Sequence, residues 1–247
     1  MAALTHSDLL RLKRWNTPTI YNGWEQITKH DRRTHFNQEG LHDFMPQMGP
    51  MVGYAVTVLI EPSNSKHQEN ATANAEYRSY LVESSGPKIV VLQDLDKPKV
   101  LGSFWGEVNA NVHKSLGCVG TITDGGVRDL DEMTNAGFKA IANRACVGHA
   151  YSWPVRWNCT VEVFGCEVHP GDLIHADKHG FLVIPPEDQE HLLEAVLFMD
   201  GNECDTVIDA ARSGSGRSFE EQLEALEKAG TEFSKRAKAK FRNRGEW

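Results

Sequence analysis

The sequence lacks several features that mark common functional classes. No apolar run approaches the roughly 18 residues of a membrane span, and the first fifteen residues contain no uninterrupted apolar stretch, so we expect neither a membrane span nor a signal peptide. The five cysteines form no CxxC pair, which predicts reduced thiols and a cytoplasmic protein. Positive charge is also outweighed: 26 Lys and Arg against 34 Asp and Glu give a net charge of −8, which argues against nucleic-acid binding.

Familiar catalytic motifs are missing as well. The chain contains no GxSxG, P-loop, GxGxxG or HExxH sequence, which disfavours serine hydrolases, nucleotide-binding enzymes, methyltransferases and zinc peptidases. His169, His175 and His179 are spaced by six and four residues, but the last two flank a predicted turn rather than a helical turn. A zinc site is therefore disfavoured.

Apolar runs alternate with helical patterns, which predicts an α/β fold with a helical C-terminal arm. We divide the chain into a catalytic domain at 1–214 and a helical basic extension at 215–247. Ser218 and Glu221 form a capping-box pattern, and 235–244 carries six basic residues, interpreted as a solvated helix face. Strands are predicted at 51–60, 88–93, 119–122, 138–141, 160–164 and 181–184, and helices at 5–14, 20–27, 75–83, 107–116, 130–136 and beyond 186.

The stretch CVGTITDGGVRDLDE, residues 118–132, is the most informative part of the sequence. We predict a buried strand that ends at Gly125-Gly126, so that Arg128 and Asp129 lie where a helix begins. An isolated Arg-Asp pair is more often a surface ion pair. Here, however, carboxylates also gather near other strand ends and helix starts. Several carboxylates close together are costly unless a cation lies among them, and their hard oxygen atoms suit Mg²⁺ or Mn²⁺. The carboxylates concerned are Asp94, Asp96, Glu107, Asp124, Asp131 and Glu132.

A second helix start is predicted at Gly106-Glu107. The free backbone N–H groups of this helical turn could hold a substrate carboxylate, whereas the simpler interpretation is that Glu107 only complements the helix dipole. Together the two motifs resemble those of the RraA-like family, whose pattern is Gly followed by Asp or Glu, twenty residues, then Arg-Asp. Glu107 and Arg128 are separated by twenty residues. VGYAVTV (52–58) and VHPGDLIHADKHGFLVIP (168–185) are also similar to family segments, so the resemblance covers about residues 15–210.

The family includes the class II 4-hydroxy-4-methyl-2-oxoglutarate/4-carboxy-4-hydroxy-2-oxoadipate aldolases. The resemblance implies a β/β/α swivelling-domain sandwich, assembled as a homotrimer or homohexamer with sites between subunits. It implies that Asp129 ligates Mg²⁺ or Mn²⁺, Glu107 holds a water of that ion, and Arg128 binds the ketone oxygen of a 2-oxo acid and stabilises the enolate. Backbone N–H groups near Glu107 and Val108 would bind the substrate carboxylate. An acid from a neighbouring subunit best matches Glu203.

One early motif departs from the family pattern. The chain reads Thr-Pro-Thr-Ile-Tyr-Asn-Gly where the family has Ser-x-x-x-Asp-Ala, so Asn22 replaces an acid. Residues 28–47, His113 and His149 are further candidates for an altered pocket. We therefore expect a metal-dependent lyase acting on a 2-oxo acid, by aldol cleavage, oxaloacetate decarboxylation or both. The alternatives are a non-catalytic protein-binding regulator of the same family, and a dehydratase or hydrolase acting on another 2-oxo acid.

Overall fold

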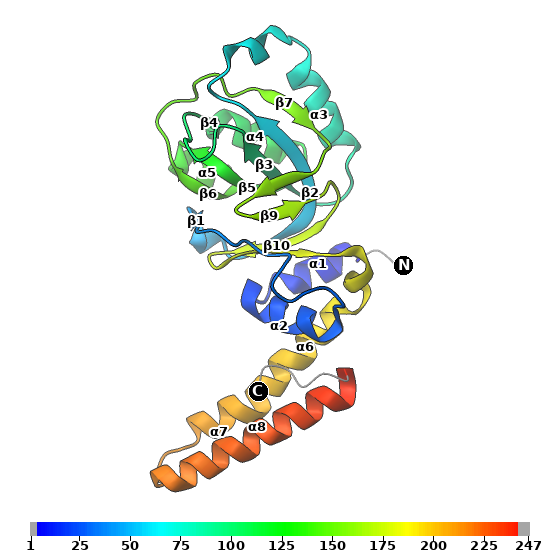
Figure 1. The fold of residues 1–247 in the computed structure, drawn as a ribbon, viewed down its shortest axis with the longest axis vertical. Helices are drawn as coiled ribbons and strands as arrows, with labels where there is room; N and C mark the ends of the chain where they lie inside the picture. Colours follow the sequence, from blue (N-terminus) through cyan, green and yellow to red (C-terminus); the bar gives the residue numbers. More distant parts are fainter. Residues whose placement is uncertain (1–3, 242–247) are drawn as a thin grey trace. The chain divides into compact units, whose positions relative to one another are not determined.

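The structure is a computed structural model that describes residues 4–241 (Figure 1). The chain divides into two compact units, which we describe separately. The sheet unit contains Leu4–Thr17 and Arg33–Pro186. The helical unit contains Pro18–Arg32 and the described residues from Glu187 onward. No helix within residues 4–241 combines the length and apolar character needed to cross a membrane.

Four parallel strands form the centre of a nine-stranded sheet (Figure 1). They lie side by side in the order β6, β5, β3, β2, and a helix follows β2, β4 and β5 in the sequence. Parallel neighbours require such crossover connections, so the alternation seen in the sequence becomes repeated β-α-β units. The elements are β2 (Met51–Ile60), α3 (Ala73–Glu83), β3 (Lys88–Asp94), α4 (Glu107–Ser115), β5 (Cys118–Val127), α5 (Leu130–Asn135) and β6 (Lys139–Ala145).

Shorter strands complete the sheet at its edges. Two strands pair antiparallel with β2, β10 at its beginning and β7 at its end. Beyond them, β11 pairs with β10, and β1 pairs with β6 at the other edge of the sheet. β4 runs parallel to the end of β5, whereas β8 and β9 form a separate hairpin. The bounds are β1 (His42–Asp43), β4 (Ser103–Trp105), β7 (Pro154–Trp157), β8 (Val161–Val163), β9 (Cys166–Val168), β10 (Leu173–Asp177) and β11 (Gly180–Ile184).

Both faces of the central strands are buried, because successive side chains of a strand point to opposite sides. Val56 and Val58 of β2 join a core cluster that includes residues of α3, α4 and α5. Ala55 and Leu59 of the same strand join a second cluster with residues of the β8–β9 hairpin. The order hairpin, sheet, helices is the β/β/α sandwich that the family resemblance implied, and that prediction is confirmed.

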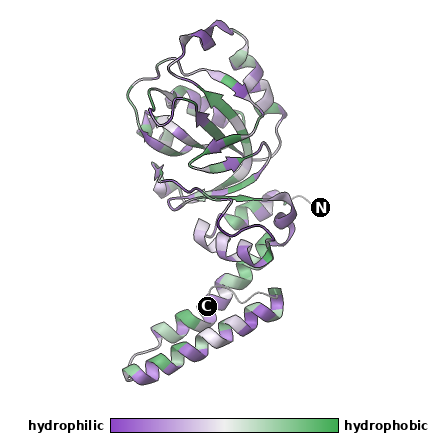
Figure 2. Cartoon of the chain, in the orientation of Figure 1, coloured by the Kyte–Doolittle hydropathy of each residue, from purple (hydrophilic) through white to green (hydrophobic). Residues whose placement is uncertain are grey.

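The helical unit is built from α2 (Thr17–Ile27), α6 (Gln189–Glu203), a π-helical turn (Cys204–Ile208), α7 (Asp209–Arg212) and α8 (Phe219–Phe241). Phe233 and Ala237 of α8 pack against Met199 and Val207 in a small apolar core. Hydrophobic and hydrophilic residues alternate along α8, as Figure 2 shows. The predicted capping box is confirmed, since Ser218 and Glu221 each accept a hydrogen bond from the other's backbone N–H, at 3.2 and 2.7 Å.

Several predicted boundaries were wrong. The second helix, α2, begins at Thr17 rather than at residue 20, since proline is favoured in a helix's first turn. The first helix, α1 (His6–Leu12), ends before residue 14 and is capped by the Thr5 side chain. β5 continues through Gly125-Gly126 to Val127. The turn at 169–172 separates β9 from β10, two strands that the sequence pattern did not reveal. Short 3-10 helices occupy Pro46–Met48, Ser65–Glu69 and Pro186–Asp188.

Candidate active site

Asp129 lies where β5 gives way to α5, and its backbone has the uncommon left-handed conformation with φ 53°. Aspartate tolerates this conformation better than most residues. Its side chain does not cap α5. Instead, Asp129 Oδ2 accepts a hydrogen bond from the backbone N–H of Glu107 at 3.0 Å, on the first turn of α4. The negative charge therefore complements the N-terminus of a different helix.

Arg128 and Gly106 complete this contact. Arg128 Nε lies 3.7 Å from Asp129 Oδ2, and both side chains are about one-third exposed, at 37% and 35%. A Cβ atom on Gly106 would lie 2.5 Å from Asp129 Oδ2 and 3.1 Å from Arg128 Nε. Only glycine leaves room for the two side chains here. The structure thus brings together the two motifs that the sequence places twenty residues apart.

The first turn of α4 has further donors. Ala110 N–H makes the first intrahelical bond, to Gly106 O. The N–H groups of Glu107, Val108 and Asn109 precede it and have no partner within the helix. Asp129 takes the first of these, which leaves Val108 and Asn109 as donors for an anion. The Glu107 side chain is exposed to solvent.

A pocket of about 160 Å³ adjoins these groups. This volume is small beside the 300–1,000 Å³ of sites for drug-sized ligands, so the pocket suits a compact ligand. The sequence had indicated Gly106, Val108, Arg128 and His149 as candidates. Asn109 and Ser152 carry no motif, and only the fold identifies them. The lining residues are Ser103, Phe104, Gly106, Val108, Asn109, Arg128, His149 and Ser152.

The residues present fit a divalent cation held by one protein ligand. Asp129 Oδ1 has no hydrogen-bond partner within residues 4–241, and the carboxylate is partly exposed. Mg²⁺ commonly takes one or two carboxylates and keeps several waters. Over the same described range, no group of three or more His, Cys, Asp or Glu side chains could hold a metal ion. A cation at Asp129 would therefore depend on water or substrate for most of its ligands.

Two other candidates lie elsewhere. Glu203 belongs to the helical unit, where its Oε1 accepts a hydrogen bond from Asn22 Nδ2 at 2.8 Å. Asn22 is the position where the chain departs from the family pattern, so the structure pairs the two residues. The prediction that His113 belongs to an altered pocket was wrong. His113 is 1% exposed, and its ring contacts the Tyr77 hydroxyl at 3.0 Å. Burial lowers the pKa of His113 to about 4.

The carboxylates near the strand ends do not form one cluster. Asp94, the last residue of β3, and Asp124, inside β5, are both buried, and Asp94 N–H donates to Asp124 Oδ1 at 2.7 Å. Lys97 Nζ lies 3.0 Å from Asp124 Oδ2, so an ammonium group supplies the neighbouring positive charge. Burial, together with the charges of Asp96 and Asp124, raises the pKa of Asp94 to about 7. Burial also raises the pKa of Asp124.

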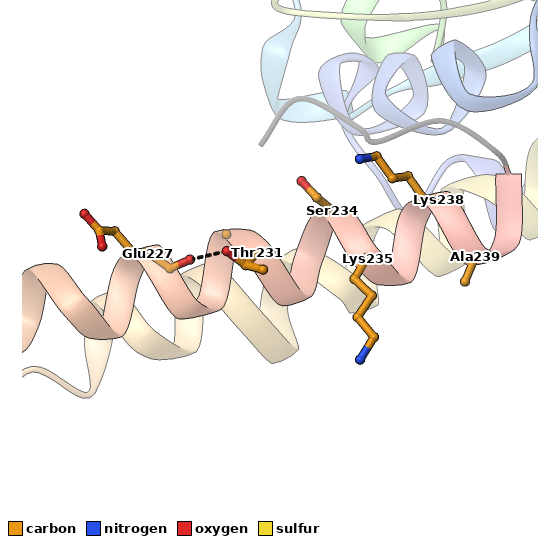
Figure 3. A pocket seen from close by; sticks show the side chains of 7 residues that line it. Glu227, Thr231, Ser234, Lys235, Lys238 and Ala239 are labelled. Atoms are coloured by element: carbon orange, nitrogen blue, oxygen red, sulfur yellow. Dashed lines mark hydrogen bonds between the residues drawn. The ribbon is translucent and has the colours of Figure 1, made fainter.

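A second hollow, about 1030 Å³ and open to solvent, follows one side of α8 (Figure 3). The Thr231 hydroxyl is already used, since it donates to the Glu227 carbonyl at 2.9 Å. Lys235 and Lys238 extend in different directions in Figure 3. Their lack of convergence favours the solvated helix face that we predicted for the basic stretch. Arg242 and Arg244 of that stretch lie outside the described residues.

The comparisons with known proteins agree with this fold and these motifs. A family model described as RraA-like, Aldolase/RraA, matches residues 17–183. The chain therefore belongs to the RraA-like family. It is also similar to Protein DlpA of Legionella pneumophila, with 22% identity over 167 residues. The match covers 67% of this chain but 26% of DlpA, so the chain spans about a quarter of that relative.

Two solved structures share the fold. An uncharacterized protein from Pseudomonas syringae pv. tomato has a TM-score of 0.71 and 20% identity, covering 94% of this chain and 96% of that one. RraAS2 from Streptomyces coelicolor, an unusual member of the RNase ES inhibitor RraA protein family, has a TM-score of 0.64 and 18% identity. That match covers 83% of this chain and 96% of RraAS2. These similarities confirm the fold class.

Proposed function

We propose that the chain is a divalent-metal-dependent lyase that acts on a 2-oxo acid through an enolate of the pyruvate type. The observation that carries the proposal is the contact between the two motifs. Asp129 Oδ2 lies 3.0 Å from Glu107 N and 3.7 Å from Arg128 Nε, beside a pocket of about 160 Å³. The carboxylate proposed to hold the metal, a cationic donor and helical N–H groups without a partner in the helix are thus close to one small pocket.

Each group has a role in this proposal. The N–H groups of Val108 and Asn109 bind the substrate carboxylate, which orients the 2-oxo group toward Arg128. The guanidinium of Arg128 donates to the 2-oxo oxygen and stabilises the negative charge that develops when the C3–C4 bond breaks. A bound Mg²⁺ or Mn²⁺ supplies further positive charge at that oxygen. Glu107 holds the water that returns a proton to C3.

Two predictions from the family resemblance remain part of the proposal. Glu203 is the acid that a neighbouring copy of the chain would contribute, in a homotrimer or homohexamer. The domain boundary at residue 214 also remains a prediction. The electron pair of the broken bond stays on the enolate until C3 is protonated, so aldol cleavage of a 4-hydroxy-2-oxo acid and decarboxylation of oxaloacetate pass through the same enolate. In aldol cleavage the water held by Glu107 first takes the proton of the C4 hydroxyl and then returns it to C3, whereas in decarboxylation CO2 leaves and only the protonation of C3 is needed.

Pyruvate release tests the proposal. The full chain is incubated with oxaloacetate or 4-hydroxy-4-methyl-2-oxoglutarate, with Mg²⁺ and with excess EDTA, and pyruvate is measured by a coupled dehydrogenase. We expect EDTA-sensitive release. Asp129→Ala should abolish the metal-dependent part, and Arg128→Ala should lower kcat by roughly 100-fold, as the loss of one charge-stabilising donor does. Full activity in either variant would contradict the assignment.

A non-catalytic regulator is the second candidate. RraAS2 is described as an unusual member of the RNase ES inhibitor RraA protein family, which makes protein binding a possibility for this fold. The partly exposed contact between Arg128 and Asp129 favours the enzyme, because Arg128 lines a pocket and the Asp129 carboxylate lies beside it. Absence of Mn²⁺ binding in calorimetry, combined with inhibition of a ribonuclease by the purified chain, would reverse this ranking.

A further inference from the structure

The loop at 146–153 contributes His149 and Ser152 to the wall of the pocket and is fixed in place. Cys146 N–H donates to Val127 O at 2.8 Å, and Ser103 N–H donates to Gly148 O at 3.0 Å. Within the loop, Ser152 N–H donates to His149 O at 3.1 Å. These bonds tie the loop to the strands that carry the site. The wall is therefore organised before a ligand binds.

Close packing also holds the loop. A Cβ atom on Gly102 would lie 2.5 Å from His149 O and 2.8 Å from Ala150 Cβ. Ala150 itself has φ 46°, a left-handed conformation that is uncommon for alanine. A backbone held in a strained conformation by its surroundings is frequent at ligand sites. The loop thus has the rigidity expected of a wall that recognises a ligand.

Ser152 Oγ is a polar atom of this wall that forms no hydrogen bond within the described part of the chain. Ser152 lines the pocket, and its Oγ is buried without a hydrogen-bond partner among the described residues. A buried hydroxyl without a partner costs free energy, so such atoms usually have a ligand or water to bind. The neighbouring His149 contributes a second polar contact. Its Nδ1 donates to Ala150 O at 2.7 Å, which leaves Nε2 as an acceptor in the neutral ring.

The charges of the lining decide which ligand group suits Ser152. Arg128 is the one side chain with a fixed positive charge among the eight lining residues, and the 2-oxo acid uses it in the proposed function. A second carboxylate would find no further side chain of fixed positive charge among these lining residues, and the divalent cation of the proposed function serves the 2-oxo end of the substrate. An ionised group without a partner is costly to desolvate, whereas a hydroxyl needs only a hydrogen bond. The lining therefore favours an uncharged distal group.

We propose that Ser152 determines substrate specificity by hydrogen-bonding an uncharged distal oxygen, a hydroxyl or carbonyl, of a 2-oxo monocarboxylic acid. The inference rests on the proposed function, since Arg128 and the α4 N-terminus hold the 2-oxo acid end. The proposed substrates are therefore 2-oxo acids with a single carboxylate. Acids with a second carboxylate, which include the assay substrates oxaloacetate and 4-hydroxy-4-methyl-2-oxoglutarate, would bind but would be the poorer ligands.

Calorimetry with three unreactive probes of equal chain length tests this without requiring turnover. The probes are 5-hydroxy-2-oxopentanoate, 2-oxoglutarate and 2-oxopentanoate, titrated into the full chain with Mg²⁺. None carries the 4-hydroxyl that aldol cleavage requires. We expect the hydroxyl probe to bind about 10-fold more tightly than 2-oxoglutarate. Ser152→Ala should weaken the hydroxyl probe by about 5- to 10-fold, the usual effect of one lost hydrogen bond, and change 2-oxopentanoate by less than about 2-fold.

The outcomes separate the inference from the proposed function. Tighter binding of 2-oxoglutarate, or equal weakening of all probes by Ser152→Ala, would overturn the role of Ser152 while retaining a 2-oxo acid site. Absence of binding by every probe would overturn both. Ser79→Ala, on the exposed side of α3, is the matched control and should leave all three affinities unchanged.

Discussion

The buried pair Asp94 and Asp124 makes the stability of the sheet unit depend on pH in an unusual direction. The pKa of Asp94 rises from about 3.9 in an unfolded chain to about 7 in the fold. Between these values the folded chain keeps a proton that the unfolded chain has lost. Unfolding therefore releases a proton, and the free energy of unfolding falls as pH rises from about 4 to about 7.

The magnitude follows from the size of this shift. Each pKa unit corresponds to about 1.4 kcal/mol, so the penalty at high pH is at most about 4 kcal/mol. Most of it accumulates between about pH 5 and pH 8, where the change is about 2 to 3 kcal/mol. Asp94→Asn mimics the protonated carboxyl and keeps an oxygen for the Asp96 N–H, which Asp94 Oδ1 accepts at 2.9 Å. The variant should lose this pH dependence.

Urea unfolding followed by circular dichroism at about pH 5 and about pH 8 tests this reasoning. We expect Asp94→Asn to gain stability over the unmodified chain, with the gain larger by about 2 kcal/mol at the higher pH. Asp131→Asn, an exposed carboxylate on α5, should show the same small difference at both values. Because Asp94 and Asp124 interact, the transition belongs to the pair. An equal gain at both pH values would refute the assignment.

Three further substitutions test the packing around the site and in the arm. Gly106→Ala should lower Mn²⁺ affinity by about 10-fold or more in calorimetry, since the added Cβ would meet the proposed metal-binding carboxylate. Gly40→Ala is the control and should leave the Mn²⁺ affinity unchanged, because a Cβ there meets no atom within 4 Å. Gly102→Ala should cost about 1–3 kcal/mol in urea unfolding by crowding the loop backbone, and Gly148→Ala, with open space, under about 0.5 kcal/mol. Phe233→Ala should cost about 3 kcal/mol and speed hydrogen exchange in α6 and α8.

The strongest sequence patterns predicted the fold well. The apolar runs at 51–60 and 88–93 became β2 and β3, because strands buried on both faces need continuous apolar side chains. The glycines of β5 led to a wrong prediction of where that strand ends. Gly126 pairs with β4 and β6, and a Cβ there would lie 2.8 Å from Cys146 Cβ, so this glycine permits close packing inside a strand. Strands of three residues such as β4 and β9 are too short to show a period.

The site was predictable only where a motif carried it. Gly106, Glu107, Arg128 and Asp129 have a recognisable spacing, and the structure brings them together. Ser152 has no such signal, because its relevance comes from a loop position and an unpartnered hydroxyl. The carboxylates at the strand ends show the same limit. Their charges indicated a nearby cation, but sequence alone could not distinguish a metal ion from a lysine.

The spacing of the two motifs follows from the pairing of β4 with β5. Trp105 pairs with Val127, so the residues that come next in each strand, Gly106 and Arg128, leave the sheet side by side. α4 and most of β5 form the crossover that parallel pairing requires, and they fill the interval between the motifs. The twenty-residue interval is therefore the length of this β-α-β path rather than a requirement of the chemistry. What the chemistry requires is the register of β4 on β5, since a one-residue slip would turn Arg128 and Asp129 away from α4.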